Sequence, residues 1–336
     1  EALEAQVPVS KSHPLRWQAA GIVLGALVTL VILAVGRRSR DQPLGAAMLW
    51  EEESKCSGYV HINGLGEYQL VRAKWNMPGD HAGDISGDGR TVTPMMKGRA
   101  YLGERCSHGG FKQSEYAALQ LRKKRLTFTA DVSAAGCGCN AALYLVSMKS
   151  SESESDCEDY YCDAMSVCGL KCAEIDIMEA NTVAFHSTLH DGLTTADPKV
   201  GLGGGAAFWN GPRDWSPEEY GVMGKCINTQ HPFEVSVEFP VDQDDKLKSV
   251  DIFLTQNDCK LTASMQQYQE VIDTLDERLK EGMTPVMSYW QSKDMLWLDG
   301  VGNDGVPFCK AKSEEDGRRE CGSAVRFFDF AVTDVE

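Results

Sequence analysis

The chain has few basic residues for its length. Its 336 residues include 33 Lys and Arg against 49 Asp and Glu, which gives a formal net charge of −16. A protein that binds nucleic acid needs a basic surface, so the composition excludes nucleic acid as a partner and is compatible with a neutral substrate. The hydrophobic fraction of 43% is that of a folded globular protein and excludes wholesale disorder.

Cysteine is absent from the first 55 residues, and all 12 cysteines follow from Cys56 onward. Their number is even, and most lie outside CxxC pairs. A zinc protein would usually show two such pairs at a fixed separation. The pattern therefore predicts disulfide bonds and an oxidising compartment, and it implies neither a metal site nor an organic cofactor.

Charge is absent from Ala19–Gly36, an 18-residue apolar stretch with Trp17 at its edge. This length predicts a transmembrane anchor over residues 17–36, after a tail of residues 1–16 and before a linker of residues 37–48. The alternative is a buried core helix, which would usually carry polar positions on one face. Residues 49–336 would form the single globular domain.

The charge balance and the cysteines disagree about orientation. The first 40 residues carry a net charge of +3. Because the whole chain has a net charge of −16, the remaining residues carry −19. Positive charge alone, counted on each side of the span, would place the C-terminal side in the cytoplasm. The cysteines indicate the opposite, so we expect a single-pass protein of the secretory pathway with a lumenal or extracellular domain. Secretion after cleavage is the alternative.

Short β-rich runs dominate the domain. The run Phe233–Phe239 alternates apolar and acidic or polar residues, as half-buried strands do. One amphipathic helix is predicted within Ser264–Glu281, ending at Gly282. Many strands with one good helix predict an all-β fold, an antiparallel sandwich or jelly roll of about 285 residues. The predicted strands are 125–132, 141–148, 233–239, 249–254 and 324–332.

The segment Cys172–Asn181 reads CAEIDIMEAN and holds three carboxylates within six residues. On a strand, Glu174 and Asp176 share one face, whereas Glu179 would point the other way because its offset from Glu174 is odd. A β-bulge near Ile177–Met178 would bring all three to one side.

Acidic triplets are usually solvated residues on an exposed strand. Here the alternation with isoleucine places the core on the opposite face, so the acids would line a flat or concave sheet face. Crowding raises the pKa of one carboxyl group, and a neutral acid beside an ionised carboxylate is what glycoside hydrolysis needs. A cation site is the competing use, although an EF-hand type of loop is absent.

Several segments, in order, resemble glycoside hydrolase family 7, the retaining cellulases with a concanavalin-like β-jelly roll. Glycoside hydrolase family 16 shares a similar EIDIxE string and the same sandwich, so the other segments discriminate. Besides EIDIMEAN, they are Asn140–Met148, Tyr161–Asp163, Asp214–Pro217, Met287–Trp290 with Asp294–Asp299, and Phe327–Phe330. The resemblance covers roughly residues 98–335, and its order makes it specific.

The resemblance implies roles for the acidic segment. Glu174 resembles the nucleophile, Glu179 the acid/base, and Asp176 the carboxylate between them that holds the nucleophile. The working carboxyls of a retaining enzyme are about 5–5.5 Å apart. His190, eleven residues after Glu179, matches a family histidine near the acid/base, whereas His186 is extra and is expected at the surface or in the core.

The resemblance also implies a substrate-binding set. Trp290 and Trp297 match tryptophans that stack on sugars on either side of the scissile bond. Weaker candidates for the glycone side are Asn140, Tyr144, Tyr161 and Asp163. Two disulfides, Cys137–Cys309 and Cys162–Cys172, are implied by the family, whereas Cys139–Cys321 and Cys157–Cys168 are plausible by proximity only.

Departures from the family indicate an open cleft. The region before Gly98 matches poorly, and the stretch Cys162–Cys172 is short where cellobiohydrolases carry a tunnel-covering loop. Glu218-Glu219-Tyr220 stands where those enzymes usually place an arginine for the product sugar. We therefore expect an endo-acting β-1,4-glucan hydrolase whose partner is a cellulose-like glucan. The alternatives are a β-1,3 or mixed-linkage glucanase, or a non-catalytic glucan-binding or wall protein.

Overall fold

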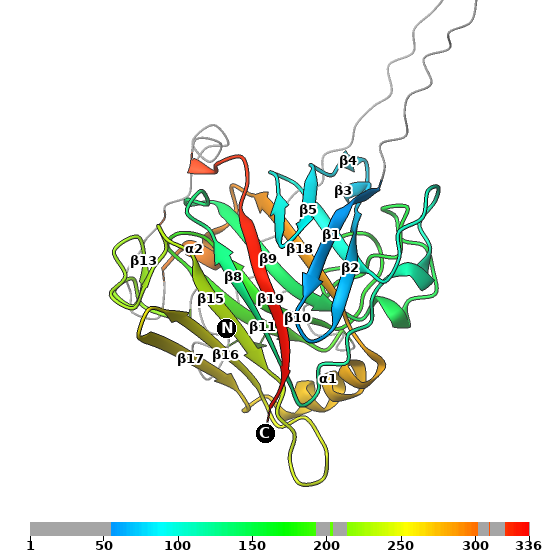
Figure 1. The fold of residues 1–336 in the computed structure, drawn as a ribbon. Helices are drawn as coiled ribbons and strands as arrows, with labels where there is room; N and C mark the ends of the chain where they lie inside the picture. The colour runs from blue at the N-terminus through cyan, green and yellow to red at the C-terminus, as the bar shows by residue number, and fades with distance from the viewer. Residues whose placement is uncertain (1–54, 193–201, 204–213, 302–308, 310–319, 336) are drawn as a thin grey trace, which may run out of the picture. The chain divides into compact units, whose positions relative to one another are not determined.

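One large sheet dominates the structure and folds into two facing layers (Figure 1). The computed structural model describes residues 55–192, 202–203, 214–301, 309 and 320–335. Within these residues the main sheet has 15 strands, and its neighbours pair antiparallel except for the parallel contact between β1 and β5. The described fold is thus mostly β-sheet with few helices, as the sequence predicts.

The strands follow one another across the sheet in a fixed order. That order is β12 (Leu202–Gly203), β11 (Phe185–His190), β10 (Glu174–Ala180), β9 (Cys139–Val146), β18 (Thr284–Gln291), β7 (Arg99–Gly103), β2 (Gly66–Arg72), β1 (Cys56–Ile62), β5 (Ile85–Gly89), β6 (Thr91–Pro94), β19 (Arg326–Asp334), β8 (Lys124–Asp131), β15 (Phe233–Glu238), β16 (Val250–Gln256) and β17 (Cys259–Met265). Two small sheets join β3 (Trp75–Met77) to β4 (Asp80–His81) and β13 (Tyr220–Gly221) to β14 (Ile227–Asn228). The helical elements given by the described residues are η1 (Gln113–Glu115), η2 (Met148–Ser150), α1 (Gln269–Glu281) and α2 (Leu296–Asp299).

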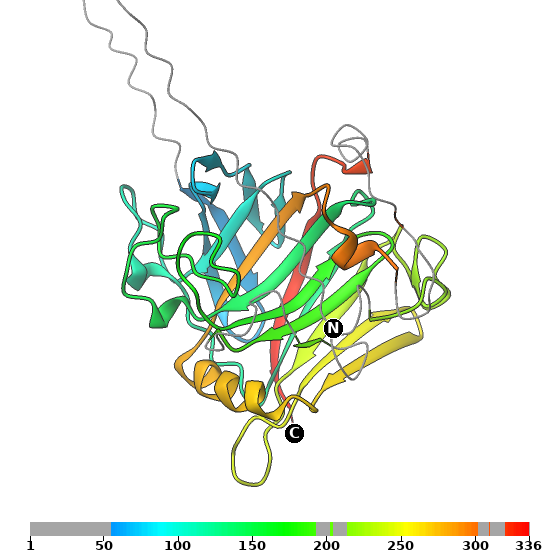
Figure 2. The ribbon, with the colours of Figure 1, turned by 180° about the vertical axis from the view of Figure 1, so that it is seen from behind.

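The main hydrophobic core lies between the two layers. Seen from behind, β18 passes in front of β19, so these strands belong to opposite layers (Figure 2). Phe128 and Phe327 from one layer share a core cluster with Leu143, Ile175 and Met287 from the other. Burying apolar side chains from both layers is the main driving force that holds such a sandwich closed.

All five predicted strands are present, and their ends differ from the predicted ones by at most two residues. In β15, Phe233, Val235 and Val237 are buried and Glu234 is exposed, which confirms the expected alternation. Ser236 is buried as well, and its hydroxyl bonds to that of Thr127 on β8 at 2.9 Å. The cross-strand partner therefore satisfies a polar group that the alternation alone would place in solvent.

The predicted helix is shorter than expected. It begins at Gln269 rather than Ser264, because Cys259–Met265 pairs with β16 as β17. Ile272, Leu275 and Leu279 are buried, and the chain leaves the helix at Gly282 with φ of 95°, a conformation that glycine adopts without strain.

The 12 cysteines form six disulfides, which confirms that the cysteines are paired. Four pairs match the expected ones: Cys137–Cys309, Cys139–Cys321, Cys157–Cys168 and Cys162–Cys172. The sequence analysis did not anticipate Cys56–Cys106 and Cys226–Cys259. The first ties β1 to the segment after β7, and the second ties the residue before β14 to β17.

The predicted anchor over residues 17–36 lies outside the described residues. Among the residues that the structure does describe, no helix is both long and apolar enough to cross a membrane. The span, the linker of residues 37–48 and the orientation stay predictions.

Candidate active site

A β-bulge in β10 brings its three carboxylates to one face of the sheet. The register against β11 shifts between Asp176 and Glu179, and the register against β9 shifts between Asp176 and Met178. Ile177 and Met178 are consecutive, yet both are fully buried in the main core. The extra residue returns Glu179 to the side of Glu174 and Asp176, as the sequence predicts.

Polar side chains satisfy the backbone around the bulge. Ser187 on β11 donates its hydroxyl to the carbonyl of Ile177 at 2.9 Å, and the Asn140 carbonyl accepts from the Ala180 N–H at 3.1 Å. Because an unpaired buried backbone group is costly, these two contacts favour the bulged conformation over a regular strand.

Glu174 and Asp176 form a coupled pair of buried carboxyls, with relative exposures of 7% and 5%. Glu174 accepts a hydrogen bond from the Ala164 backbone N–H at 2.8 Å. Burial raises the pKa of Glu174 well above its usual value, and the negative charges of Asp176 and Asp163 add to this effect. Burial likewise raises the pKa of Asp176, which hydrogen-bonds to Glu174. Two carboxyls so placed share a proton, since both cannot ionise easily.

Glu179 has a different set of neighbours. The Asn140 side-chain amide donates to Glu179 Oε1 at 2.8 Å. The Asn140 side chain is itself fixed, because its carbonyl oxygen accepts from the Ala180 N–H. Burial raises the pKa of Glu179, while the Asn140 hydrogen bond and the positive charges of His186 and His190 oppose the rise. A carboxyl group with a raised pKa in a partly buried position is suited to general acid catalysis.

Two histidines on β11 face these carboxylates. His190 lies opposite Glu174 in the ladder, and its Nε2 is 3.3 Å from Asp176 Oδ2. His186 lies opposite Glu179, and its Nδ1 is 2.9 Å from Asp214 Oδ1. His186 is therefore the histidine across the ladder from Glu179, although the resemblance pointed to His190. His186 is buried, which agrees with one of its two expected placements.

The two tryptophans stack on each other. The ring centroids of Trp290 and Trp297 are 6.3 Å apart with planes at 24°. A sugar between them would need about 7–8 Å, twice the usual carbon contact distance of roughly 3.5–4 Å. The two rings therefore form one platform instead of separate platforms on either side of a bond, because only four residues separate β18 from α2. Trp290 pairs with Asn140, so this platform lies toward Glu179.

Three of the expected glycone-side residues, Tyr144, Tyr161 and Asp163, are buried near one another, and the last two belong to the loop that precedes β10. The fourth, Asn140, lies beside Glu179 instead. Tyr144 and Tyr161 join hydroxyl to hydroxyl at 2.8 Å, and the Arg99 guanidinium lies 3.9 Å from the centre of the Tyr161 ring. Asp163 accepts from the Val167 N–H at 3.0 Å, and Asn140 is fully buried. These contacts hold the loop that delivers the Ala164 N–H to Glu174.

Candidate metal ligands can be read from the same groups. Glu174, Asp176 and His190 each offer one atom within 4.8 Å of the others. The mutual hydrogen bond of the carboxyls, the Ala164 contact and the histidine contact already use these atoms, so we assign no ion. The other such cluster among the described residues includes Cys137 and Cys309, which are disulfide-bonded.

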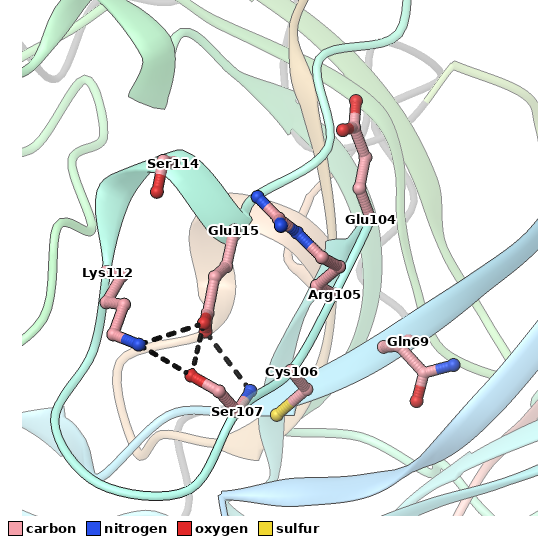
Figure 3. A pocket seen from close by; sticks show the side chains of 8 residues that line it. All are labelled: Gln69, Glu104, Arg105, Cys106, Ser107, Lys112, Ser114 and Glu115. Carbon is pink, nitrogen blue, oxygen red and sulfur yellow. Dashed lines mark hydrogen bonds and ion pairs between the residues drawn. The ribbon is translucent and has the colours of Figure 1, made fainter.

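A separate cavity of about 630 Å³ lies between Gln69 on β2 and residues 104–115 (Figure 3). Lys112 Nζ donates to the Ser107 hydroxyl at 3.0 Å, and Lys55 Nζ lies 3.4 Å from Glu115, so the charge of Glu115 is compensated. None of the β10 carboxylates lines this cavity. We place the candidate chemistry at β10 because reactive groups converge there.

Sequence reasoning missed three groups at this site. They are the Ala164 N–H, the buried His186 and its partner Asp214. Asp214 stood out only as part of a motif, and a backbone N–H carries no signal in a sequence. If the two strands 174–180 and 185–190 had been paired as an antiparallel hairpin with the predicted bulge included, His186 would have been placed beside Glu179.

The fold is a two-layered β-sandwich whose candidate site gathers three carboxylates on one strand. The family model for glycosyl hydrolase family 7 matches residues 91–165. Endoglucanase 1 of Pyricularia oryzae is 26% identical over 281 residues, which are 67% of this chain and 64% of that protein. The chain is thus similar to glycoside hydrolase family 7 over this segment, and it matches 64% of the length of the Pyricularia endoglucanase.

Solved structures agree on the fold. The native endocellulase EGI of Humicola insolens matches with a TM-score of 0.60 at 20% identity, over 80% of this chain and 92% of that one. A cellobiohydrolase of Melanocarpus albomyces complexed with cellotetraose matches with a TM-score of 0.60 at 17% identity, over 85% and 97%. At such identities the similarity establishes the sandwich fold.

Proposed function

We propose that the chain is a retaining, endo-acting β-1,4-glucan hydrolase. The observation that carries the proposal is the bulge in β10, which puts Glu174, Asp176 and Glu179 on one face with unlike surroundings. Endoglucanase relatives and a neighbour complexed with cellotetraose support a β-glucan as substrate. The match covers only 64% of the first of these relatives, so activity and substrate belong to the proposal.

In the proposed first step the Glu174 carboxylate attacks the anomeric carbon. The bond from this carbon to the leaving oxygen breaks, and that oxygen takes the proton of Glu179. In the second step Glu179, now ionised, removes a proton from water, and the water oxygen displaces Glu174. The configuration is retained because the carbon is inverted twice. Asp176 carries the proton that it shares with Glu174 and donates a hydrogen bond that stabilises the Glu174 carboxylate when the covalent bond breaks.

The surroundings of each carboxyl fit its role. Ala164 and Asp176 hold Glu174 from two sides, which orients one oxygen for attack. Asn140 fixes Glu179, and the tryptophan platform lies on its side, where the leaving sugar would stack. The segment between Cys162 and Cys172 is short and closed by a disulfide. Because it is too short to form a covering loop, the proposal includes an open cleft.

The decisive assay compares the wild type with Glu174→Gln on carboxymethylcellulose. We expect hydrolysis by the wild type and a loss of more than about 1,000-fold in the variant. Equal activity in both proteins would refute the assignment. Laminarin and lichenin, assayed in parallel, distinguish β-1,4 from β-1,3 or mixed-linkage specificity, and binding without hydrolysis would indicate a glucan-binding protein.

We further propose that residues 17–36 anchor this domain in a membrane, with the domain in an oxidising compartment. The six disulfides support the compartment, since such bonds persist where thiols are not kept reduced. Alkaline extraction of membranes from cells that express the full chain tests the anchor, and protection from added protease tests the orientation. Release of the chain by alkali, or cleavage that shows the domain in the cytosol, would contradict the respective part.

A further inference from the structure

A histidine–aspartate pair lies behind the candidate acid/base on the active face. His186 Nδ1 and Asp214 Oδ1 are 2.9 Å apart, and their side chains are 2% and 0% exposed. The second oxygen of Asp214 accepts from the Ser187 N–H at 3.0 Å, and the Asp214 N–H donates to the Phe185 carbonyl at 2.8 Å. Asp214 is thus fixed by β11 itself, and it fixes the imidazole ring in turn.

The other nitrogen of this ring has no partner among the described residues. His186 Nε2 is buried and makes no hydrogen bond. His186 is the direct ladder partner of Glu179, so both side chains project from the same face of the sheet. A buried imidazole with one nitrogen held by a carboxylate resembles the arrangement that orients histidine in catalytic sites.

We propose that His186, oriented by Asp214, is a positioning residue for Glu179 that supplies a compensating positive charge beside its carboxyl group. This inference rests on the proposed function, because it assigns a role within that reaction. It concerns a residue that the family resemblance left without a role, and it gives His186 and His190 different roles. His190 contacts Asp176 at 3.3 Å and also adds positive charge near Glu179, whereas His186 is the direct ladder partner of Glu179.

The charges around the pair support this assignment. Burial alone would lower the pKa of His186, but the charge and hydrogen bond of Asp214 outweigh it and raise the pKa. Among the residues that the structure describes, the charged groups that face His186 and Glu179 are Asp214, His190 and Asp176. The imidazolium opposes the rise in the pKa of Glu179 that burial causes.

This compensation matters because Glu179 works in both directions. It must hold a proton to assist departure of the leaving group and must lose it to activate water. Without a nearby cation, burial would leave the group a good acid but would delay its ionisation. The His186–Asp214 pair therefore keeps Glu179 usable as a base.

The test measures kcat/KM against pH for His186→Asn and Asp214→Asn. Asparagine at 186 can still donate to Asp214 but carries no charge, and asparagine at 214 can still accept from Ser187 but no longer stabilises the imidazolium. Because either change removes positive charge near Glu179, the alkaline limb should move to higher pH by about half a unit or more. His231→Asn, a change at an exposed histidine, is the control and should leave the profile unchanged.

A second measurement is independent of hydrolysis. The imidazole of His186 is titrated by NMR in the wild type and in Glu179→Gln. Coupling is reciprocal, so removing the carboxylate should lower the pKa of His186. Two results would overturn the inference. One is a kcat/KM profile of His186→Asn and Asp214→Asn that is lower at every pH but keeps the wild-type limbs; the other is a His186 pKa that does not change in Glu179→Gln. Absence of glucan hydrolysis in the wild type would instead refute the proposed function, and the NMR comparison would still test the coupling.

Discussion

The Asn140 amide donates to the Glu179 carboxylate at 2.8 Å while its own carbonyl accepts from Ala180 at 3.1 Å. One buried side chain on β9 therefore fixes both the candidate acid/base and the backbone next to it. The contact crosses the strand pair in which the bulge occurs, so the geometry of Glu179 depends on two adjacent strands.

Asn140→Ala tests this contact. The hydrogen bond favours the ionised carboxylate, so its loss should raise the pKa of Glu179 and move the alkaline limb of kcat/KM upward. A hydrogen bond to a charged group contributes about 1.5–3 kcal/mol, which corresponds to roughly 10- to 150-fold in kcat/KM if it acts fully in the transition state. Unchanged rates and limbs would show that Asn140 serves only the fold.

Asp176→Asn tests the shared proton of the carboxyl pair. The charge of Asp176 raises the pKa of Glu174, so its removal should lower that pKa. Glu174 must be ionised to attack, so the acid limb of kcat/KM should move to lower pH while kcat falls. The pH profile of initial rates provides the measurement. An acid limb that stays in place would mean that Asp176 does not control ionisation of the nucleophile.

Glu174→Gln should increase stability near neutral pH. The pKa of Glu174 is raised in the folded state, so the group stabilises the fold below its unfolded pKa. This contribution is lost as pH rises through the folded value, because the unfolded chain ionises Glu174 freely whereas the folded chain must keep the proton or ionise the buried group beside Asp176. The variant should therefore raise Tm at pH 7 and have a smaller effect at pH 4. A loss of Tm at pH 7 would contradict this account.

The disulfide Cys162–Cys172 should matter for activity as well as for stability. It closes the segment whose Ala164 N–H holds Glu174. The double change Cys162→Ser with Cys172→Ser should cost about 2–3 kcal/mol in the free energy of unfolding and at least about tenfold in kcat. Urea unfolding and initial rates give the two quantities.

Cys226–Cys259 provides the matched control. It closes a longer loop, with a sequence separation of 33 against 10, and it ends on β17 at one end of the strand order, whereas β10 is third from the other end. Its replacement by serine should cost at least as much stability while kcat is retained. Equal losses of kcat in both double variants would remove the link between the Cys162–Cys172 segment and Glu174.

The sequence predicted the elements whose pattern is local. The five strands show period-2 alternation or high β-propensity, and the acidic string shows both its alternation and the odd offset that requires a bulge. The helix start was misplaced by five residues, because Ser264 and Met265 pair with β16 instead. Strand pairing is a long-range contact, and it overrides local periodicity.

The parts of the site that were missed depend on contacts between distant segments. Asp214 meets His186 across 28 residues, and the Ala164 N–H meets Glu174 through a loop held by Tyr161 and Asp163. The stacked tryptophans show the same limit, since spacing along the chain did not reveal that α2 returns Trp297 onto Trp290.

Mechanism-based labelling tests the central claim most directly. The wild type is incubated with a 2-deoxy-2-fluoro cellobioside that carries a good leaving group, and the labelled peptide is sequenced by mass spectrometry. The account predicts one covalent glycosyl group, on Glu174, and none in Glu174→Gln. Labelling of Asp176 or Glu179 instead, or hydrolysis of glucan by an enzyme that never accumulates the adduct, would contradict it.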